Sequence, residues 1–64
     1  MNTQQCILGI DIGSISISIA ELDLNKTVLK TAYSFHNGDI KGCLKGLLKQ
    51  FELHEVCSIA ITSS

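Results

Sequence analysis

The chain has 64 residues, five lysines against six acidic residues, and a formal net charge of −1 at pH 7. This even charge balance excludes the basic patch of a nucleic-acid-binding protein, and the apolar runs are too short to cross a membrane as helices. A chain of this length buries only about 60% of its unfolded surface, yet 45% of its residues are hydrophobic. We therefore expect residues 1–64 to be part of a larger domain.

The first apolar run, residues 6–12 (CILGIDI), predicts a short strand that is buried on both faces. Asp11 stands at its end, and Gly13 follows where the backbone must turn. Charged residues rarely occupy buried strands unless they are paired or bind a ligand. This position favours Asp11 as a catalytic carboxylate that holds a divalent cation. The alternative is an aspartate that bonds only to its own turn.

Residues 14–22 (SISISIAEL) predict a second strand. Serine and isoleucine alternate over residues 14–19, which gives this part an apolar face and a hydroxyl-bearing face. We expect Ile15, Ile17 and Ile19 to share the apolar face. The turn that joins the two strands would present backbone N–H groups and hydroxyls beside the carboxylate, and such donors suit phosphate oxygens. An ordinary hairpin, which also favours glycine, is the alternative. The candidate phosphate-binding residues are Asp11, Gly13, Ser14, Ile15 and Ser16.

A turn at residues 23–26 leads into a predicted third strand, 27–35, which must run antiparallel to the second because the link is short. Either Asn37 or Asp39 is expected to cap a helix over residues 39–52. That helix has one apolar face and a flank of solvated lysines. The apolar residues are Ile40, Cys43, Leu44, Leu47, Leu48 and Phe51, and the lysines are Lys41, Lys45 and Lys49.

A fourth strand is predicted over residues 56–62 (VCSIAIT), apolar on both faces. The helix supplies a right-handed crossover, so this strand is expected parallel to the first at the centre of the sheet. The fold class is α/β, with order β-β-β-α-β and antiparallel first, second and third strands. Thr62, Ser63 and Ser64 follow where open α/β sheets place ligands, so we consider them candidates to face one.

The three cysteines, Cys6, Cys43 and Cys57, have no C-x-x-C spacing. We interpret them as small buried hydrophobes in a reducing compartment. His36 and His54 are expected at the surface.

Gly42 and Gly46 lie four residues apart on the predicted helix, although each is less favourable than alanine there by about 1 kcal/mol. Close approach of another element or a partner would explain them, and drift on a tolerant surface is the alternative.

The stretch Gly9–Ser14 (GIDIGS) resembles the first phosphate motif of the actin/Hsp70/sugar-kinase superfamily, and the element order is similar to its ribonuclease-H-like half-domain. Three further stretches resemble one branch, the CoA-substrate-specific enzyme activases (BadF/BadG/BcrA/BcrD-type ATPases). These stretches are Leu8–Asp11, Tyr33–Gly38 and Ala60–Ser64. The resemblance implies that residues 1–64 are the N-terminal part of a single actin-like ATPase domain, truncated after its fourth strand.

The resemblance also implies a function for the whole protein. Members of this family bind ATP and Mg²⁺, form homo-oligomers with a [4Fe-4S] cluster, and drive electrons into a 2-hydroxyacyl-CoA dehydratase or benzoyl-CoA reductase. None of the three cysteines matches the cluster-ligand positions, so the cluster ligands would lie outside residues 1–64. By the same resemblance, Asp11 would hold Mg²⁺ opposite the β- and γ-phosphates. A sugar or acetate kinase and an actin-like filament protein remain alternatives.

Two further expectations concern the chain as a whole. Residues 1–5 lack a basic segment typical of a signal peptide, so we expect a cytoplasmic location without membrane or nucleic-acid partners. The isolated 64 residues are expected to self-associate through an open sheet edge and an apolar sheet face, or to need further chain. They are also expected to bind ATP weakly or not at all and to be inactive alone.

Overall fold

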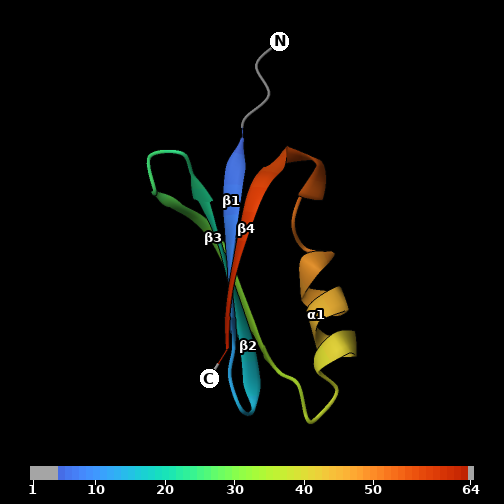
Figure 1. The fold of residues 1–64 in the computed structure, drawn as a ribbon. Coiled ribbons are helices and arrows are strands. Elements are labelled where there is room, and N and C mark those ends of the chain that lie inside the picture. Colours follow the sequence, from blue (N-terminus) through green and yellow to red (C-terminus); the bar gives the residue numbers. More distant parts are fainter. Residues whose placement is uncertain (1–4, 64) are drawn as a thin grey trace.

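The computed structural model describes residues 5–63, so the expectations for Ser64 and for residues 1–4 lie outside the described part of the chain. The elements follow the expected order (Figure 1). They are β1 (Cys6–Ile12), β2 (Ser16–Asp23), β3 (Val28–Phe35), α1 (Ile40–Leu48), a 3₁₀ helix (Leu53–Glu55) and β4 (Val56–Ser63).

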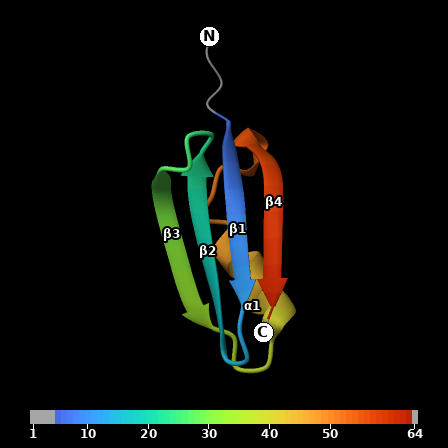
Figure 2. The same cartoon turned by 60° about the vertical axis from the view of Figure 1, so that its left-hand side comes forward.

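The four strands form one mixed sheet in the order β3-β2-β1-β4 (Figure 2). β1 pairs antiparallel with β2 and parallel with β4, and β2 pairs antiparallel with β3. The predicted α/β class and all three strand directions are therefore confirmed. β4 lies at an edge, however, and the expected central position is wrong for the described residues.

A single helix covers one face of the sheet, and the hydrophobic core lies between them (Figure 1). The alternation of β1 and β2 directs every second side chain to this face. The other face of β1 is only half-buried. The expectation that β1 is buried on both faces is therefore wrong, because α1 covers only one side of the sheet. The core residues are Leu8, Ile10, Ile17, Ile19, Leu47 and Phe51.

The Ile/Ser segment enters the sheet later than expected. β2 begins at Ser16, and Ile15 lies outside the strand with 62% of its surface exposed. Ile17 and Ile19 are fully buried, as the alternation predicts. Ile15 differs from them because it occupies the turn, where no strand geometry directs its side chain into the core.

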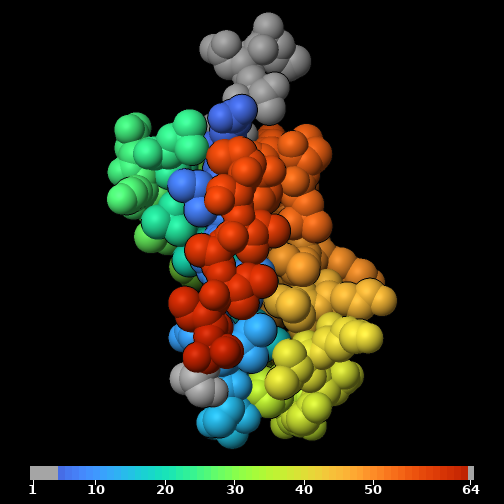
Figure 3. All heavy atoms as spheres, viewed as in Figure 1, coloured from blue at the N-terminus to red at the C-terminus, as the bar shows by residue number. Residues whose placement is uncertain are grey.

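β4 lies at the surface of the molecule, where its spheres form a continuous red band (Figure 3). Although Ile59 and Ile61 pair with core residues of β1, they are 52% and 60% exposed. Their exposure follows from the position of the helix, because α1 packs mainly against β2 and β3. An uncovered apolar edge is the feature that motivates the expected self-association, which stays a prediction.

α1 begins with the predicted aspartate cap but ends earlier than expected. The Asp39 side chain accepts a hydrogen bond from the Gly42 N–H at 3.0 Å, so Asp39 and not Asn37 is the N-cap. After Leu48 the chain tightens, because the Phe51 N–H bonds to the Leu48 carbonyl three residues back. Phe51 still reaches the core from this tight turn. The lysine flank is exposed, as predicted.

The two helix glycines have different surroundings, which predicts opposite responses to alanine. A Cβ at Gly42 would overlap the capping carboxylate of Asp39, whereas a Cβ at Gly46 would meet open space. Gly46→Ala should therefore raise the free energy of unfolding by about 1 kcal/mol. Gly42→Ala should gain almost nothing, because displacing the cap offsets the same helix gain by about 1 kcal/mol. Urea unfolding of both variants tests this, and equal stabilisation would contradict the capping role of Gly42.

Candidate functional site

Asp11 lies on the sheet face opposite α1, near the end of β1, and its side chain is exposed. Its register partners on either side are Ser18 of β2 and Thr62 of β4. The Thr62 hydroxyl donates a hydrogen bond to Asp11 Oδ1 at 3.1 Å. The carboxylate is thus held across the parallel pair of strands by a residue 51 positions later. The Asp11 carboxylate therefore bonds to a neighbouring strand and not to its own turn.

The connection between β1 and β2 is a two-residue turn. The Gly13 N–H donates to the Ser16 carbonyl at 2.8 Å, which closes the turn around Ser14 and Ile15. The Gly13 N–H is therefore engaged within the turn, and the N–H groups of the two central residues lie outside the strand ladder. Among the described glycines, Gly38 is the one with a positive φ, 83°. Gly13 thus serves the turn without a left-handed conformation.

The open face of the sheet carries the hydroxyl groups that the sequence predicted beside Asp11. Ser18 pairs directly with Asp11, and Ser16 lies two residues away on the same face. Thr62 joins this group from β4. Ser63 pairs with Ile12 and belongs to the opposite face, so it does not take part.

His36 is the residue of this region that sequence reasoning missed. The expectation of a surface histidine is wrong, because His36 is only 6% exposed. Its Nε2 lies 3.1 Å from the Gly13 carbonyl, and its Nδ1 accepts from the Gly38 N–H at 3.0 Å. A histidine followed by Asn-Gly between a strand and a helix cap was the only available signal. His54 is exposed, as expected.

The oxygen ligands around Asp11 are too few to hold Mg²⁺ unless phosphate oxygens also bind the ion. In the described part of the chain, no group of three or more carboxylate, histidine or cysteine side chains converges. Asp11 supplies a single carboxylate with neighbouring hydroxyls. Mg²⁺ commonly binds proteins through one or two carboxylates, with water and substrate phosphates completing its shell. The site therefore suits a phosphate-bound Mg²⁺ rather than an ion held by protein ligands alone.

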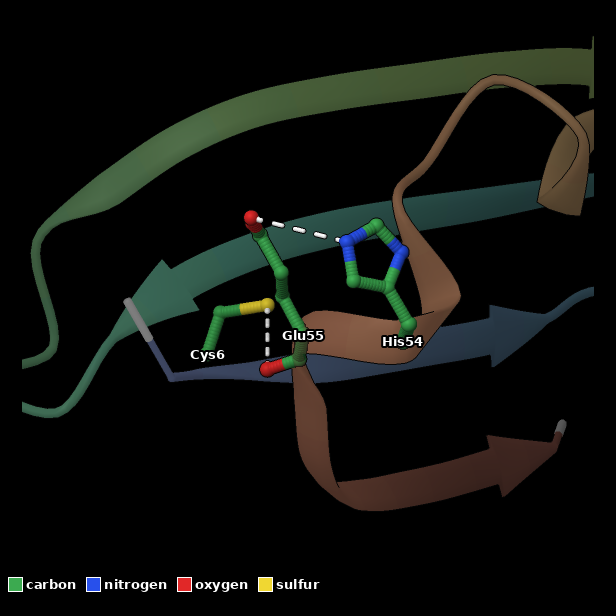
Figure 4. Close-up of polar contacts among 3 residues, drawn as sticks. All are labelled: Cys6, His54 and Glu55. Atoms are coloured by element: carbon green, nitrogen blue, oxygen red, sulfur yellow. Dashed lines mark hydrogen bonds and ion pairs between the residues drawn. The ribbon is translucent and has the colours of Figure 1, made fainter. Parts of the chain in front are cut away.

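Cys6 is a buried thiol with no exposed face. Its Sγ contacts the Glu55 carbonyl at 3.5 Å, beside the weak pair of His54 and the Glu55 carboxylate (Figure 4). Burial, reinforced by the Glu21 carboxylate, raises the pKa of the Cys6 thiol from 9.0 to about 11. The thiol is therefore protonated at neutral pH and is a poor metal ligand or nucleophile.

The other two cysteines occupy different places in the fold. Cys43 belongs to α1 and is half-buried, whereas Cys57 is exposed on β4, so the expectation of three buried cysteines is wrong for Cys57. Among the described residues, no cysteine belongs to a group of three or more side chains that could hold a metal ion. These residues do not fit an iron–sulfur cluster.

Asp11 is exposed on the open face of the sheet. Four pockets of 320 to 500 Å³ line the helix side and the edges of the sheet, and none of these four includes Asp11 or the turn. The pocket between β3 and α1 has a volume of about 430 Å³ and includes His36, Gly42 and Gly46. A ligand at Asp11 would thus need a second wall from elsewhere to be enclosed.

Comparisons with protein-family models, curated proteins and solved structures find no match for this chain. Among the described residues, no helix is long and apolar enough to cross a membrane.

Proposed function

We propose that this chain forms the metal- and phosphate-binding corner of an ATP-binding protein with the ribonuclease-H-like fold of the actin-like ATPases. One observation carries the proposal: the exposed Asp11 carboxylate, bonded by Thr62, lies on a hydroxyl-lined sheet face next to a two-residue turn. The strand order β3-β2-β1-β4 and the parallel β1–β4 pair are those that such a half-domain requires.

The chemistry follows from the residue types. Mg²⁺ bound with ATP neutralises charge on the β- and γ-phosphates during phosphoryl transfer. The Asp11 carboxylate would hold that ion, directly or through water, and the Thr62 hydroxyl would keep the carboxylate in one orientation. Ser14 and Ile15 would donate backbone N–H groups to phosphate oxygens, and the Ser16 hydroxyl would add a further donor.

The finer proposal rests on the resemblance of three sequence stretches to the CoA-substrate-specific enzyme activases. We propose that the whole protein is an ATP-driven activator that delivers electrons to a 2-hydroxyacyl-CoA dehydratase or benzoyl-CoA reductase, and that it acts as a homo-oligomer. The exposed β4 edge, with Ile59 and Ile61 uncovered, supports the proposal that further protein covers this sheet. Its cluster would be bound by residues other than Cys6, Cys43 and Cys57.

Calorimetric titration tests the phosphate-binding role. We expect Mg-ATP to bind more tightly than ATP in excess EDTA, because the cation links the phosphates to Asp11. In the whole protein, adenosine should bind more weakly than Mg-ATP, since Asp11 and the adjacent turn would contact only phosphate and metal. Equal affinity for adenosine and Mg-ATP, or affinity unchanged by EDTA, would contradict the proposal.

A further inference from the structure

The buried His36 joins the turn between β1 and β2 to the loop before α1. Its ring reaches the Gly13 carbonyl through Nε2 at 3.1 Å, and its backbone N–H donates to the Ile15 carbonyl at 3.0 Å. On the other side, Nδ1 accepts from Gly38 and the His36 carbonyl accepts from the Asp39 N–H at 2.7 Å. One residue therefore engages two carbonyls of the turn and two N–H groups of the helix-capping loop.

These bonds assign the proton on the ring. The Gly38 N–H can only donate, so Nδ1 must be an unprotonated acceptor. The proton of a neutral imidazole then resides on Nε2, where it is donated to the Gly13 carbonyl. The left-handed φ of Gly38, 83°, places its N–H at Nδ1, a backbone conformation that a residue with a Cβ rarely adopts.

The anchored carbonyls determine where two N–H groups of the turn point. In a planar trans peptide, the N–H points opposite to the C=O of the same unit. The Gly13 carbonyl shares its peptide unit with the Ser14 N–H, and the Ile15 carbonyl shares its unit with the Ser16 N–H. Both carbonyls face His36, so both N–H groups are directed away from it.

We propose that His36 is a positioning residue, which fixes the turn of Gly13–Ser16 so that the Ser14 N–H is presented to a phosphate. The phosphate part of this inference rests on the proposed function, whereas the fixing of the turn does not. His36 would touch neither the phosphate nor the metal, and its side chain acts on the turn through the Gly13 peptide unit.

Two amide substitutions separate the two sides of the ring. In His36→Gln, the side-chain amide reaches the place of Nε2 and can still donate to Gly13. In His36→Asn, the amide reaches only the place of Nδ1, so it can accept from Gly38 but cannot reach Gly13. Hydrogen exchange at the Gly13 amide, which bonds to Ser16 inside the turn, reports whether the turn opens. The Asp23 amide, which bonds to Thr27 at the far end of the hairpin, reports the intact fold.

We expect exchange at Gly13 to be about tenfold faster in His36→Asn than in the wild type, the effect of losing one hydrogen bond. His36→Gln should stay near the wild-type rate, and Asp23 should be unchanged in both variants. Mg-ATP affinity should fall about tenfold in His36→Asn alone. Equal Gly13 exchange in the two variants would overturn the inference. If the wild type and the two variants show this exchange pattern but the whole wild-type protein binds no Mg-ATP, the proposed function fails and the turn-fixing role of His36 stands.

Faster exchange at Asp23 as well would mean that a variant has unfolded. In that case, the tautomer of His36 in the wild type is the deciding measurement, read from long-range ¹H–¹⁵N spectra. A proton on Nε2 supports the inference, and a proton on Nδ1 overturns it.

Discussion

Replacement of Asp11 by Asn is expected to remove the magnesium-dependent part of ATP binding and, in the whole protein, most ATP hydrolysis. The asparagine carbonyl can still accept the hydrogen bond from Thr62, so the sheet should remain intact. The amide carries no charge, however, and cannot neutralise or orient a cation. Calorimetric titration should therefore show Asp11→Asn binding Mg-ATP no better than the wild type binds ATP in EDTA.

Asp23 offers a matched control for Asp11. Its carboxylate accepts from the N–H groups of Asn25 and Thr27 in the turn at the opposite end of β2. Asp23→Asn removes the same charge from the chain without touching the candidate site. It should leave the affinity for Mg-ATP unchanged. If both variants bind Mg-ATP like the wild type, or both lose it equally, Asp11 has no specific part in metal binding.

Leu8→Ala is expected to have the largest effect on stability. Leu8 is fully buried at the centre of β1, between the sheet and α1. Truncation of such a leucine typically lowers the free energy of unfolding by about 2–5 kcal/mol. A chain of this size has a total stability of only several kcal/mol, on the order of 0.1 kcal/mol per residue. We therefore expect Leu8→Ala to be largely unfolded in urea concentrations that leave the wild type native.

Leu24 is the control for Leu8, because it lies in the turn after β2 with 57% of its surface exposed. Leu24→Ala removes the same atoms from a solvated position and should change stability by less than about 0.5 kcal/mol. A Leu8→Ala variant as stable as Leu24→Ala would contradict the core described here.

Local patterns in the sequence were sufficient to predict the sheet and the start of the helix. The alternation over Ile17 and Ile19 fixes which face of β2 is buried, and a short link makes β3 antiparallel. Asp39 was one of two predicted caps, and the structure selects it through its bond to Gly42. Asp11 and the serines of β2 share the open face, as the period of two requires.

Three features that depend on contacts distant in sequence were not predicted. His36 is buried because the loop before α1 folds against the turn at Gly13, 23 residues earlier in the chain, and no periodicity signals such a contact. The hydrogen bond of Thr62 to Asp11 depends on the β1–β4 register, which sequence alone does not give. The edge position of β4 was not predicted, because an apolar sequence indicates a buried strand whether or not a neighbouring strand covers it.

The central claim is that Asp11 and the adjacent turn bind the phosphates of Mg-ATP, and NMR chemical-shift mapping tests it most directly. Mg-ATP added to the ¹⁵N-labelled whole protein should shift the amide signals of Asp11, Ser14, Ile15 and Thr62 most strongly, with little change at Asp23. These shifts should disappear with Asp11→Asn. Strongest shifts in the pocket between β3 and α1, at Gly42 and Gly46, or no saturable shifts at all, would contradict the account.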